Sequence, residues 1–353
     1  MKLGIIGLPQ SGKTTIYNAL THSNQPVVIS GKIELHTAVV EVPDQRLERL
    51  AELYHPQKKT AARITFVDIS GMDGDTQGVI EGQLRNELGQ MDGFILVVRC
   101  FQNDSVPHIS GSIDPIRDIS AMESELLLVD LIAVEAKLER LNEELQRGGR
   151  KKTEVQNEID IFTKLQTALT QEKPLRALSL SPKEERFLAG YQFLTQKPML
   201  VVLNLGEGQQ SPDVSALTEH SKVVPLQGKL EMEIAQLPAE EAEEFLAEYK
   251  IDEPSLYRMI REAYDLLGQQ SFFTVGEDEV RAWTVHRGAT APEAAGVIHS
   301  DLQKGFIRAE VVPYQVLLEL GGMVAAREAG KVQLEGKDYV VQDGNIMHVR
   351  FNV

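Results

Sequence analysis

The chain has 353 residues, of which 42% are hydrophobic and 25% charged, a composition typical of a globular protein with room for two or three domains. Its formal net charge of -16 argues against broad nonspecific nucleic-acid binding, and sequence-specific DNA binding is not expected. No apolar run reaches the roughly 18 residues of a membrane span, so we expect a cytoplasmic protein without membrane contact. The single cysteine, Cys100, excludes disulfides and is expected to be buried and inert.

Four short apolar runs rich in β-branched residues divide the first part of the chain: 2–7, 63–70, 93–99 and 198–205. Such runs predict buried parallel strands. Helix-like stretches at 13–21 and 45–54 lie between the first and third runs, with a further strand predicted between them at 36–43. Alternating strands and helices predict an α/β sheet that binds its ligand at the carboxyl ends of the strands.

From about residue 118 the sequence becomes long, charged and helical. Two apolar stripes have helical spacing: Leu127, Leu131, Val134, Leu138, Leu141 and Leu145, and then Val155, Ile159, Phe162, Leu165 and Leu169. The Gly-Gly turn between them predicts an antiparallel helical hairpin, which either projects as an arm or packs on the main core.

After a helix predicted at 255–270, short strand signals and a helix-like stretch at 291–305 predict a small mixed β domain. The predicted domains are an α/β domain at 1–120 and 196–270, the inserted hairpin at 121–195 and the β domain at 271–353.

The segment from Gly7 to Thr14 satisfies the phosphate-binding pattern of Gly, any four residues, Gly, Lys, and Ser or Thr. It follows a predicted strand and opens a predicted helix, where backbone N–H groups converge on phosphates at the positive end of the helix dipole. The residues concerned are Gln10, Ser11, Gly12, Lys13, Thr14 and Thr15. We expect Lys13 to reach the β and γ phosphates of ATP, and Thr14 to bind Mg²⁺.

A second element is expected to hold the Mg²⁺ from the far side of the γ phosphate. Asp68 stands at the carboxyl end of a buried strand, and the N–H of Gly71 can approach the phosphate. An Asp at the end of a strand is also a common cap of a helix or turn. This signal therefore indicates a Mg²⁺ site only in combination with the phosphate-binding motif.

Asn204 ends the strand at 198–205, at the position where P-loop GTPases have Asn-Lys-x-Asp and the Asp binds guanine. Here Leu205 replaces the Lys and Glu207 replaces the Asp. The extra methylene moves the carboxylate, and a site that loses a paired polar contact loses most of its discrimination. We therefore expect no guanine preference.

The chain resembles the YchF subfamily of Obg-related P-loop proteins, the Obg-like ATPases, from Leu3 to Val353. The resemblance rests on "GLPQSGKTT", "TAVVEVPDQRLERL", "FVDISG", "VVRCFQND", "NLGE" and the C-terminal "GATAPEAAGVIHSDLQKGFIRAEVV" and "EGKDYVVQDGNIMHVRFNV". It implies a nucleotide domain with an inserted helical hairpin and a C-terminal TGS domain, a ubiquitin-like β-grasp fold. It also implies ATP binding at least as good as GTP binding, slow hydrolysis and association with ribosomes.

The same resemblance assigns Asn204 and Glu207 to the base site and adds Gly228 near the base. Met72 takes the position where Ras-like proteins have a water-orienting Gln, and a thioether cannot orient water as an amide does. His108 matches a family His and is the candidate for positioning water. The alternative is a loop histidine that hydrogen-bonds locally.

The switch segment departs from the family pattern, because Lys32 replaces the Mg²⁺-binding Thr and Gly31 replaces a Cys. Thr37 aligns with a different family Thr. An ammonium at position 32 either takes over part of the metal's electrostatic role or marks a site that barely hydrolyses ATP. Gln10 replaces an Asn that helps to hold K⁺ in related proteins, which puts K⁺ as a cofactor in question.

Three functions remain open. The leading one is a slow, Mg²⁺-dependent ATPase that acts as a translation-linked switch on a ribosome-like partner. The second is a docking module that binds nucleotide without hydrolysis, and the third is a GTPase. At the hairpin tip, four cations either contact RNA phosphates or form a solvated turn: Arg147, Arg150, Lys151 and Lys152.

Overall fold

The computed structural model describes residues 1–22, 34–70, 80, 82–249 and 251–352. The chain divides into two compact units. Unit 1 combines Met1–Ala38 with Thr65–Leu256, and unit 2 combines Val39–Ile64 with Tyr257–Val353. The segment 39–64 thus packs with the C-terminal part of the chain, while the domain limits predicted from the sequence stay a prediction.

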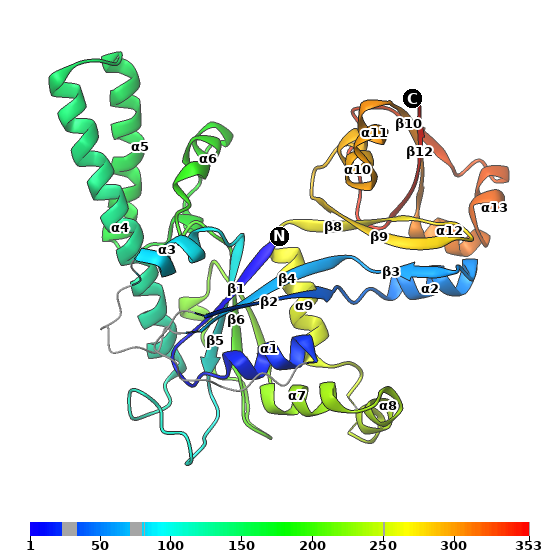
Figure 1. Cartoon of the computed structure of the whole chain (residues 1–353), viewed down its shortest axis with the longest axis horizontal. Coiled ribbons are helices and arrows are strands. Elements are labelled where there is room, and N and C mark those ends of the chain that lie inside the picture. The colour runs from blue at the N-terminus through cyan, green and yellow to red at the C-terminus, as the bar shows by residue number, and fades with distance from the viewer. Residues whose placement is uncertain (23–33, 71–79, 81, 250, 353) are drawn as a thin grey trace. The chain divides into compact units, whose positions relative to one another are not determined.

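Unit 1 is built on a six-stranded sheet with β1 near its centre (Figure 1). The strand order is β2 (Glu34–Glu41), β4 (Arg63–Ser70), β1 (Lys2–Ile6), β5 (Gly93–Arg99), β6 (Met199–Asn204) and β7 (Lys222–Leu226). From β4 to β7 neighbouring strands are parallel, with Ile5 opposite Asp68 and Arg99 opposite Asn204. The predicted parallel strands are confirmed, and their carboxyl ends share one edge of the sheet.

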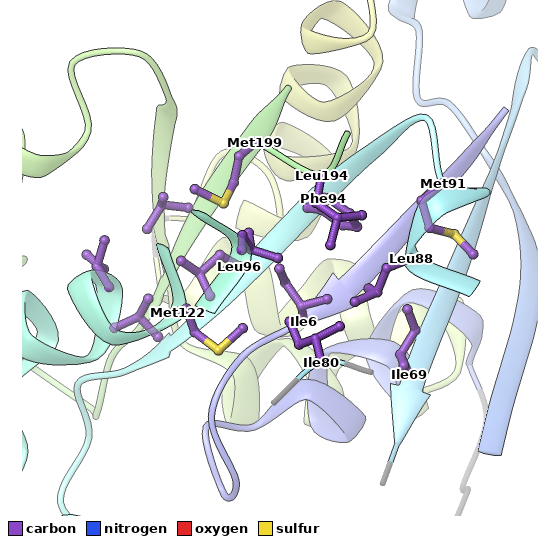
Figure 2. Close-up of a cluster of buried hydrophobic side chains, with 14 of the residues drawn as sticks. Ile6, Ile69, Ile80, Leu88, Met91, Phe94, Leu96, Met122, Leu194 and Met199 are labelled. Atoms are coloured by element: carbon purple, nitrogen blue, oxygen red, sulfur yellow. The ribbon is translucent and has the colours of Figure 1, made fainter. Parts of the chain in front are cut away.

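Helices cover the sheet of unit 1. They include α1 (Lys13–Thr21), α3 (Gly82–Gly89) and α7 (Gly228–Gln236). α8 (Ala239–Glu248) packs on α7, and α9 (Ser255–Leu266) leads into unit 2. Figure 2 shows one apolar cluster of this unit, in which Ile6, Phe94 and Leu96 of the sheet meet Leu88 and Met122 of the helices. Burying these side chains stabilises the sheet by roughly 1.5–3 kcal/mol for each large apolar residue.

The inserted hairpin consists of α4 (Pro115–Arg147) and α5 (Lys152–Thr170). Asp114 caps α4 by accepting the Arg117 N–H, and Pro115 at the first position has no N–H to lose. Both predicted stripes face each other in a separate apolar cluster around Phe162. The first turns of α4 pack on the sheet through Met122, so the hairpin is both docked at its base and paired as an arm beyond it (Figure 1). No helix in the described ranges is long and apolar enough to cross a membrane.

A group of buried hydrogen bonds joins the hairpin to the segment before β6. Asp130 of α4 is fully buried, and its carboxylate accepts the Leu194 N–H at 2.9 Å and the Thr195 N–H at 2.7 Å. The Thr195 hydroxyl donates a third hydrogen bond at 2.7 Å. Burial raises the pKa of Asp130, and the donors oppose that shift. The connection from α5 to β6 also contains η1 (Leu175–Ala177), α6 (Pro182–Leu188) and η2 (Ala189–Tyr191), and η3 (Ser215–Leu217) follows β6.

Unit 2 contains a second six-stranded sheet. Its order is β11 (Gln333–Glu335), β10 (Phe306–Pro313), β12 (Asn345–Phe351), β8 (Gln269–Thr274), β9 (Glu279–His286) and β3 (Lys58–Thr60). β8 and β12 are parallel neighbours at the centre, and β9 and β10 are antiparallel to them. With α10 (Ala291–Ile298) and α11 (Ser300–Lys304) packed on one side, this is the expected β-grasp fold.

The segment 39–64 contributes β3 and α2 (Gln45–Tyr54) to unit 2. Arg46 of α2 forms an ion pair with Asp343 at 2.7 Å, and Tyr54 accepts the Met323 N–H at 3.0 Å. Two further helices, α12 (Tyr314–Leu320) and α13 (Met323–Glu328), follow β10.

Two predicted helices have different limits in the structure. The helix expected at 255–270 ends at Leu266, and residues 269–270 already belong to β8. The helix expected at 291–305 is divided at His299, whose ring accepts the Asp301 N–H and caps a new helix.

Candidate nucleotide-binding site

The loop between β1 and α1 needs glycine at two positions. Gly12 is the N-cap of α1 with φ +96, and a Cβ there would lie 2.2 Å from the Asn204 amide nitrogen. A Cβ on Gly7 would lie 2.4 Å from the Val97 carbonyl oxygen. Since Ile16 donates the first helical bond, to the Gly12 carbonyl, the N–H groups of residues 13–15 lack an acceptor within α1. They point to the place where an anion binds at a helix N-terminus.

Lys13 is positioned by the same loop. Its ammonium is buried and donates to the Gly7 carbonyl at 2.9 Å and the Leu8 carbonyl at 3.0 Å. These contacts hold a positive charge against the loop, so the long side chain loses little further freedom when it meets a phosphate.

Thr14 and Asp68 converge at the edge of the sheet. The Thr14 hydroxyl donates to an Asp68 carboxylate oxygen at 3.5 Å, and Asp68 is 1% exposed. Nearby Tyr17 has a raised pKa because of its burial and the Asp68 charge. Hydroxyl and carboxylate oxygens suit Mg²⁺, which takes few protein ligands and completes its octahedron with phosphate and water. Among the described residues no cluster of three or more His, Cys, Asp or Glu forms a metal cage.

Asn204 joins the phosphate loop to the expected base loop. Its Oδ1 accepts the Gly228 N–H at 2.9 Å, and its Nδ2 donates to the Ser11 carbonyl at 3.0 Å. These two partners fix the orientation of the amide, because only the oxygen can accept and only the nitrogen can donate. The side chain is 3% exposed, so both bonds are shielded from water.

The base loop after β6 is braced by a residue that the sequence did not single out. Gln209 accepts the Gly206 N–H at 2.9 Å and donates to the Cys100 carbonyl at 2.8 Å. Leu205 is half-buried, and its N–H donates to the Leu226 carbonyl, whereas Glu207 is exposed. In the part of the chain that the structure describes, no donor holds the Glu207 carboxylate. Gln209 lies in a polar loop with no periodic pattern, so no local signal identifies it.

His108 lies away from solvent and both its ring nitrogens have partners. Nδ1 accepts the Ser110 N–H at 3.1 Å, so Nε2 carries the proton and donates to Asp118 at 2.9 Å. Arg117 pairs with the other Asp118 oxygen at 2.8 Å. The loop before His108 is held by Arg99, which donates to the Val106 carbonyl at 2.7 Å. The structure therefore shows the local hydrogen bonding that the alternative interpretation of His108 describes.

Several predicted positions fall outside the described residues. They are Gly31, Lys32, Gly71 and Met72. Thr37 lies on β2 and is exposed. Cys100 is buried, and burial raises the pKa of its thiol to about 12, which keeps it protonated and unreactive as expected.

Comparisons with known proteins cover the whole chain. A family model described as "50S ribosome-binding GTPase" matches residues 2–164. The family model YchF-GTPase_C, described as "Protein of unknown function (DUF933)", matches residues 269–352.

Curated relatives extend over nearly the full length. "Ribosome-binding ATPase YchF" of Haemophilus influenzae is 42% identical, covering 100% of this chain and 99% of its own. The protein of the same name in Bacillus subtilis is 40% identical over 99% of both chains. Human "Obg-like ATPase 1" is 36% identical, covering 100% of this chain and 92% of its own. A solved structure, "Structure of the Schizosaccharomyces pombe YchF GTPase", is 32% identical with a TM-score of 0.88, and covers 99% of this chain and 97% of its own.

Proposed function

Because the chain belongs to the YchF family of Obg-like P-loop ATPases, we propose that it binds ATP with Mg²⁺, hydrolyses it slowly and acts as a ribosome-associated switch. The observation that carries the nucleotide part is the Asn204 bridge between Ser11 and Gly228, which couples the phosphate loop to the base loop. Relatives named for ribosome binding support the ribosomal part.

At the phosphate end, we assign charge neutralisation to Lys13 and the N–H groups at the start of α1. Thr14 and Asp68 are the residues that would hold Mg²⁺. The bound metal would offset the charge of the β and γ phosphates and order them against the loop. Gly71 is proposed to add a backbone N–H on the γ side. Gln10 in place of the family Asn leads us to expect equal activity in K⁺ and Na⁺ buffers.

At the base end, the proposal of ATP over GTP rests on Leu205 and Glu207. Guanine recognition needs a fixed carboxylate that accepts two hydrogen bonds, and adenine presents an acceptor at one of those places. The Glu207 carboxylate is exposed, so binding guanine would have to order a flexible side chain. Leu205 replaces a long polar side chain by a half-buried apolar one.

A specificity swap tests the base assignment. The double substitution Leu205→Lys with Glu207→Asp restores Asn-Lys-x-Asp, and we expect it to shift the ratio of GTP to ATP affinity by about tenfold or more, which corresponds to about 1.4 kcal/mol. Glu207→Gln is the control for loss of the charge alone. Calorimetric titrations of the swapped protein with both nucleotides that keep the original ratio would refute the assignment.

Hydrolysis is proposed to use His108 after it leaves Asp118, with the ring then positioning the attacking water. Under this proposal His108→Ala lowers the rate of phosphate release with little change in ATP affinity, besides the loss of stability that follows from removing its two hydrogen bonds. Asp118→Ala, which removes the acceptor of the Nε2 proton and so frees the ring without removing it, should retain turnover. If His108→Ala leaves turnover unchanged but destabilises the protein, the residue anchors its loop and does nothing catalytic.

The second candidate function is a docking module that binds nucleotide without hydrolysing it. The engagement of both His108 nitrogens favours it, because a ring held by Ser110 and Asp118 has no nitrogen left for water. Tight, Mg²⁺-dependent ATP binding without phosphate release would select this function over the ATPase.

The ribosomal contact is proposed to include the hairpin tip. There, Arg147 pairs with Glu143 at 3.2 Å, Lys151 pairs with Glu154 at 3.6 Å, and Arg150 pairs with glutamates on both helices. Exposed pairs of this kind contribute only about 0–1 kcal/mol, so RNA phosphates can displace them at small cost.

A further inference from the structure

The sheet of unit 2 has an interruption beside its central strand β12. β12 and β8 are in register at Ile346 and Phe273, which places Met347 opposite Thr274, the last residue of β8. β12 continues to Phe351, so its last four residues run past the end of β8. Their other edge is paired with β10, where Phe351 stands opposite Phe306. Residues 348–351 therefore have one strand neighbour, within the described part of unit 2, and one open edge of about 13 Å.

A cavity of about 340 Å³ lies along this open edge. β12 forms its floor, and Thr274 and Val275 close one end. One wall is apolar and consists of Ile298 and Leu302 from α10 and α11. The opposite wall is provided by Met323 and Arg327 of α13. The groove thus runs beside the exposed strand residues and has two chemically different sides.

The side chains of β12 repeat this division because successive residues point to opposite faces of a sheet. Met347, Val349 and Phe351 lie on the side of α10, where Met347 belongs to the buried core and Phe351 is 44% exposed. His348 and Arg350 lie on the other side and are exposed.

The second side is strongly cationic in an otherwise acidic chain. Arg327 and Arg350 share the single buried carboxylate of Glu310, to which Arg327 bonds at 2.9 Å. Arg308 stands directly opposite Arg350 on β10, and among the described residues it has no carboxylate partner. Like charges opposite each other on neighbouring strands repel, so binding of an anion would stabilise this face of the sheet. Three arginines against the Glu310 carboxylate leave an excess positive charge on this face of the sheet, where Arg327 lines the groove and Arg308 stands one strand further away on β10.

We propose that this groove binds an extended peptide that adds a strand to the open edge of β12, with apolar and acidic residues alternating along it. The backbone of the peptide pairs with residues 348–351, and its apolar side chains lie against Ile298 and Leu302. Its carboxylates meet Arg327, within the positive field of Arg350 and Arg308. Main-chain pairing supplies affinity, and the two walls supply the alternating specificity. This docking function is separate from the nucleotide site.

The test uses a fluorescein-labelled peptide of about eight residues in which Val and Glu alternate, with blocked ends, added to the full-length protein. Two control peptides have the same composition, one with the valines and glutamates in separate blocks and one N-methylated along one edge. We expect saturable binding of the alternating peptide, measured by anisotropy, and at least about tenfold weaker binding of both controls.

Protein variants locate the site. Arg308→Glu and Arg350→Glu should each weaken the alternating peptide about tenfold, whereas Lys337→Glu, an exposed cation of the same unit, should leave it unchanged. Unfolding followed by Trp283 fluorescence checks that unit 2 stays folded. Bound peptide should also slow amide exchange in residues 348–351.

Three results would overturn the proposal: no binding of the alternating peptide, equal binding of the N-methylated peptide, or exchange protection elsewhere. Inorganic phosphate and a short RNA serve as competitors. If either binds at the arginines while the peptides do not, the groove recognises a phosphate-bearing ligand and the strand-addition proposal is wrong.

Discussion

Asn204→Asp is a nearly isosteric change that tests how the phosphate and base loops are joined. The substitution keeps an oxygen for the Gly228 N–H but places a second oxygen against the Ser11 carbonyl, which was 3.0 Å from the amide nitrogen. One hydrogen bond is lost, and a carboxylate is buried with a hydrogen-bond donor for only one of its two oxygens. Together these effects should lower the free energy of unfolding by about 2–4 kcal/mol at neutral pH.

The same substitution should show a characteristic pH dependence. Burial and the facing carbonyl raise the pKa of the introduced carboxyl, so the folded state binds the proton more readily than the unfolded state. Stability relative to the parent should therefore recover as the pH falls through that raised pKa, because the acid O–H can donate to the Ser11 carbonyl.

Urea unfolding of the nucleotide-free protein at pH 7.5 and 5.5 measures both effects. Far-ultraviolet circular dichroism is the suitable probe, since the single tryptophan, Trp283, lies in unit 2. Asn204→Ala is the control, because it lacks a titratable group and should show no recovery in acid. A loss below about 0.5 kcal/mol, or a loss that does not change with pH, would refute the role of the bridge.

Three further predictions concern other parts of the chain. Asp130→Asn turns an amide N–H₂ toward backbone donors and should lower the free energy of unfolding in urea by about 2–4 kcal/mol. Asp160→Asn, on the exposed face of α5, is the control and should lower it by almost nothing. Equal losses for the two variants would contradict the role of the Asp130 hydrogen bonds. Arg327 and then Arg350 lower the pKa of Glu310 below its ordinary 4.5, so its stabilisation is present above pH 4.5 and is lost as the pH falls through the lowered value. Glu310→Gln should therefore weaken the dependence of unfolding free energy on pH below pH 4.5, measured by Trp283 fluorescence. An unchanged pH dependence would contradict the role of the ion pairs. Neutralising the four tip cations should weaken cosedimentation with ribosomes and flatten its salt dependence, and unaltered binding would exclude the tip.

The sequence predicted those features that depend on local patterns. The helix at 13–21 agrees with α1, and the strand at 63–70 agrees with β4. The apolar stripes identified the hairpin, because spacings of three and four place side chains on one helix face whatever surrounds them. The phosphate loop was recognisable because its glycines are needed locally, as the φ of Gly12 illustrates.

Features that depend on tertiary contacts were not predictable from local pattern. The helix at 45–54 was expected correctly, but no local signal indicates that Arg46 pairs with Asp343, almost 300 residues later in the chain. The pairing of Gln209 with Cys100 is likewise visible only once two strand ends are side by side. The four tip cations formed a basic cluster in the sequence, yet three of them have glutamate partners contributed by neighbouring helical turns.

The most direct test of the nucleotide assignment is a calorimetric titration of nucleotide-free protein with ATP and with GTP, each with Mg²⁺ and with EDTA, followed by phosphate release from the same samples. We predict micromolar ATP binding that weakens in EDTA, weaker GTP binding and slow release of phosphate. Lys13→Ala should abolish binding of both nucleotides and serves as the negative control. Tighter binding of GTP than of ATP would contradict the assignment of Leu205 and Glu207, and equal binding in Lys13→Ala would contradict the site itself.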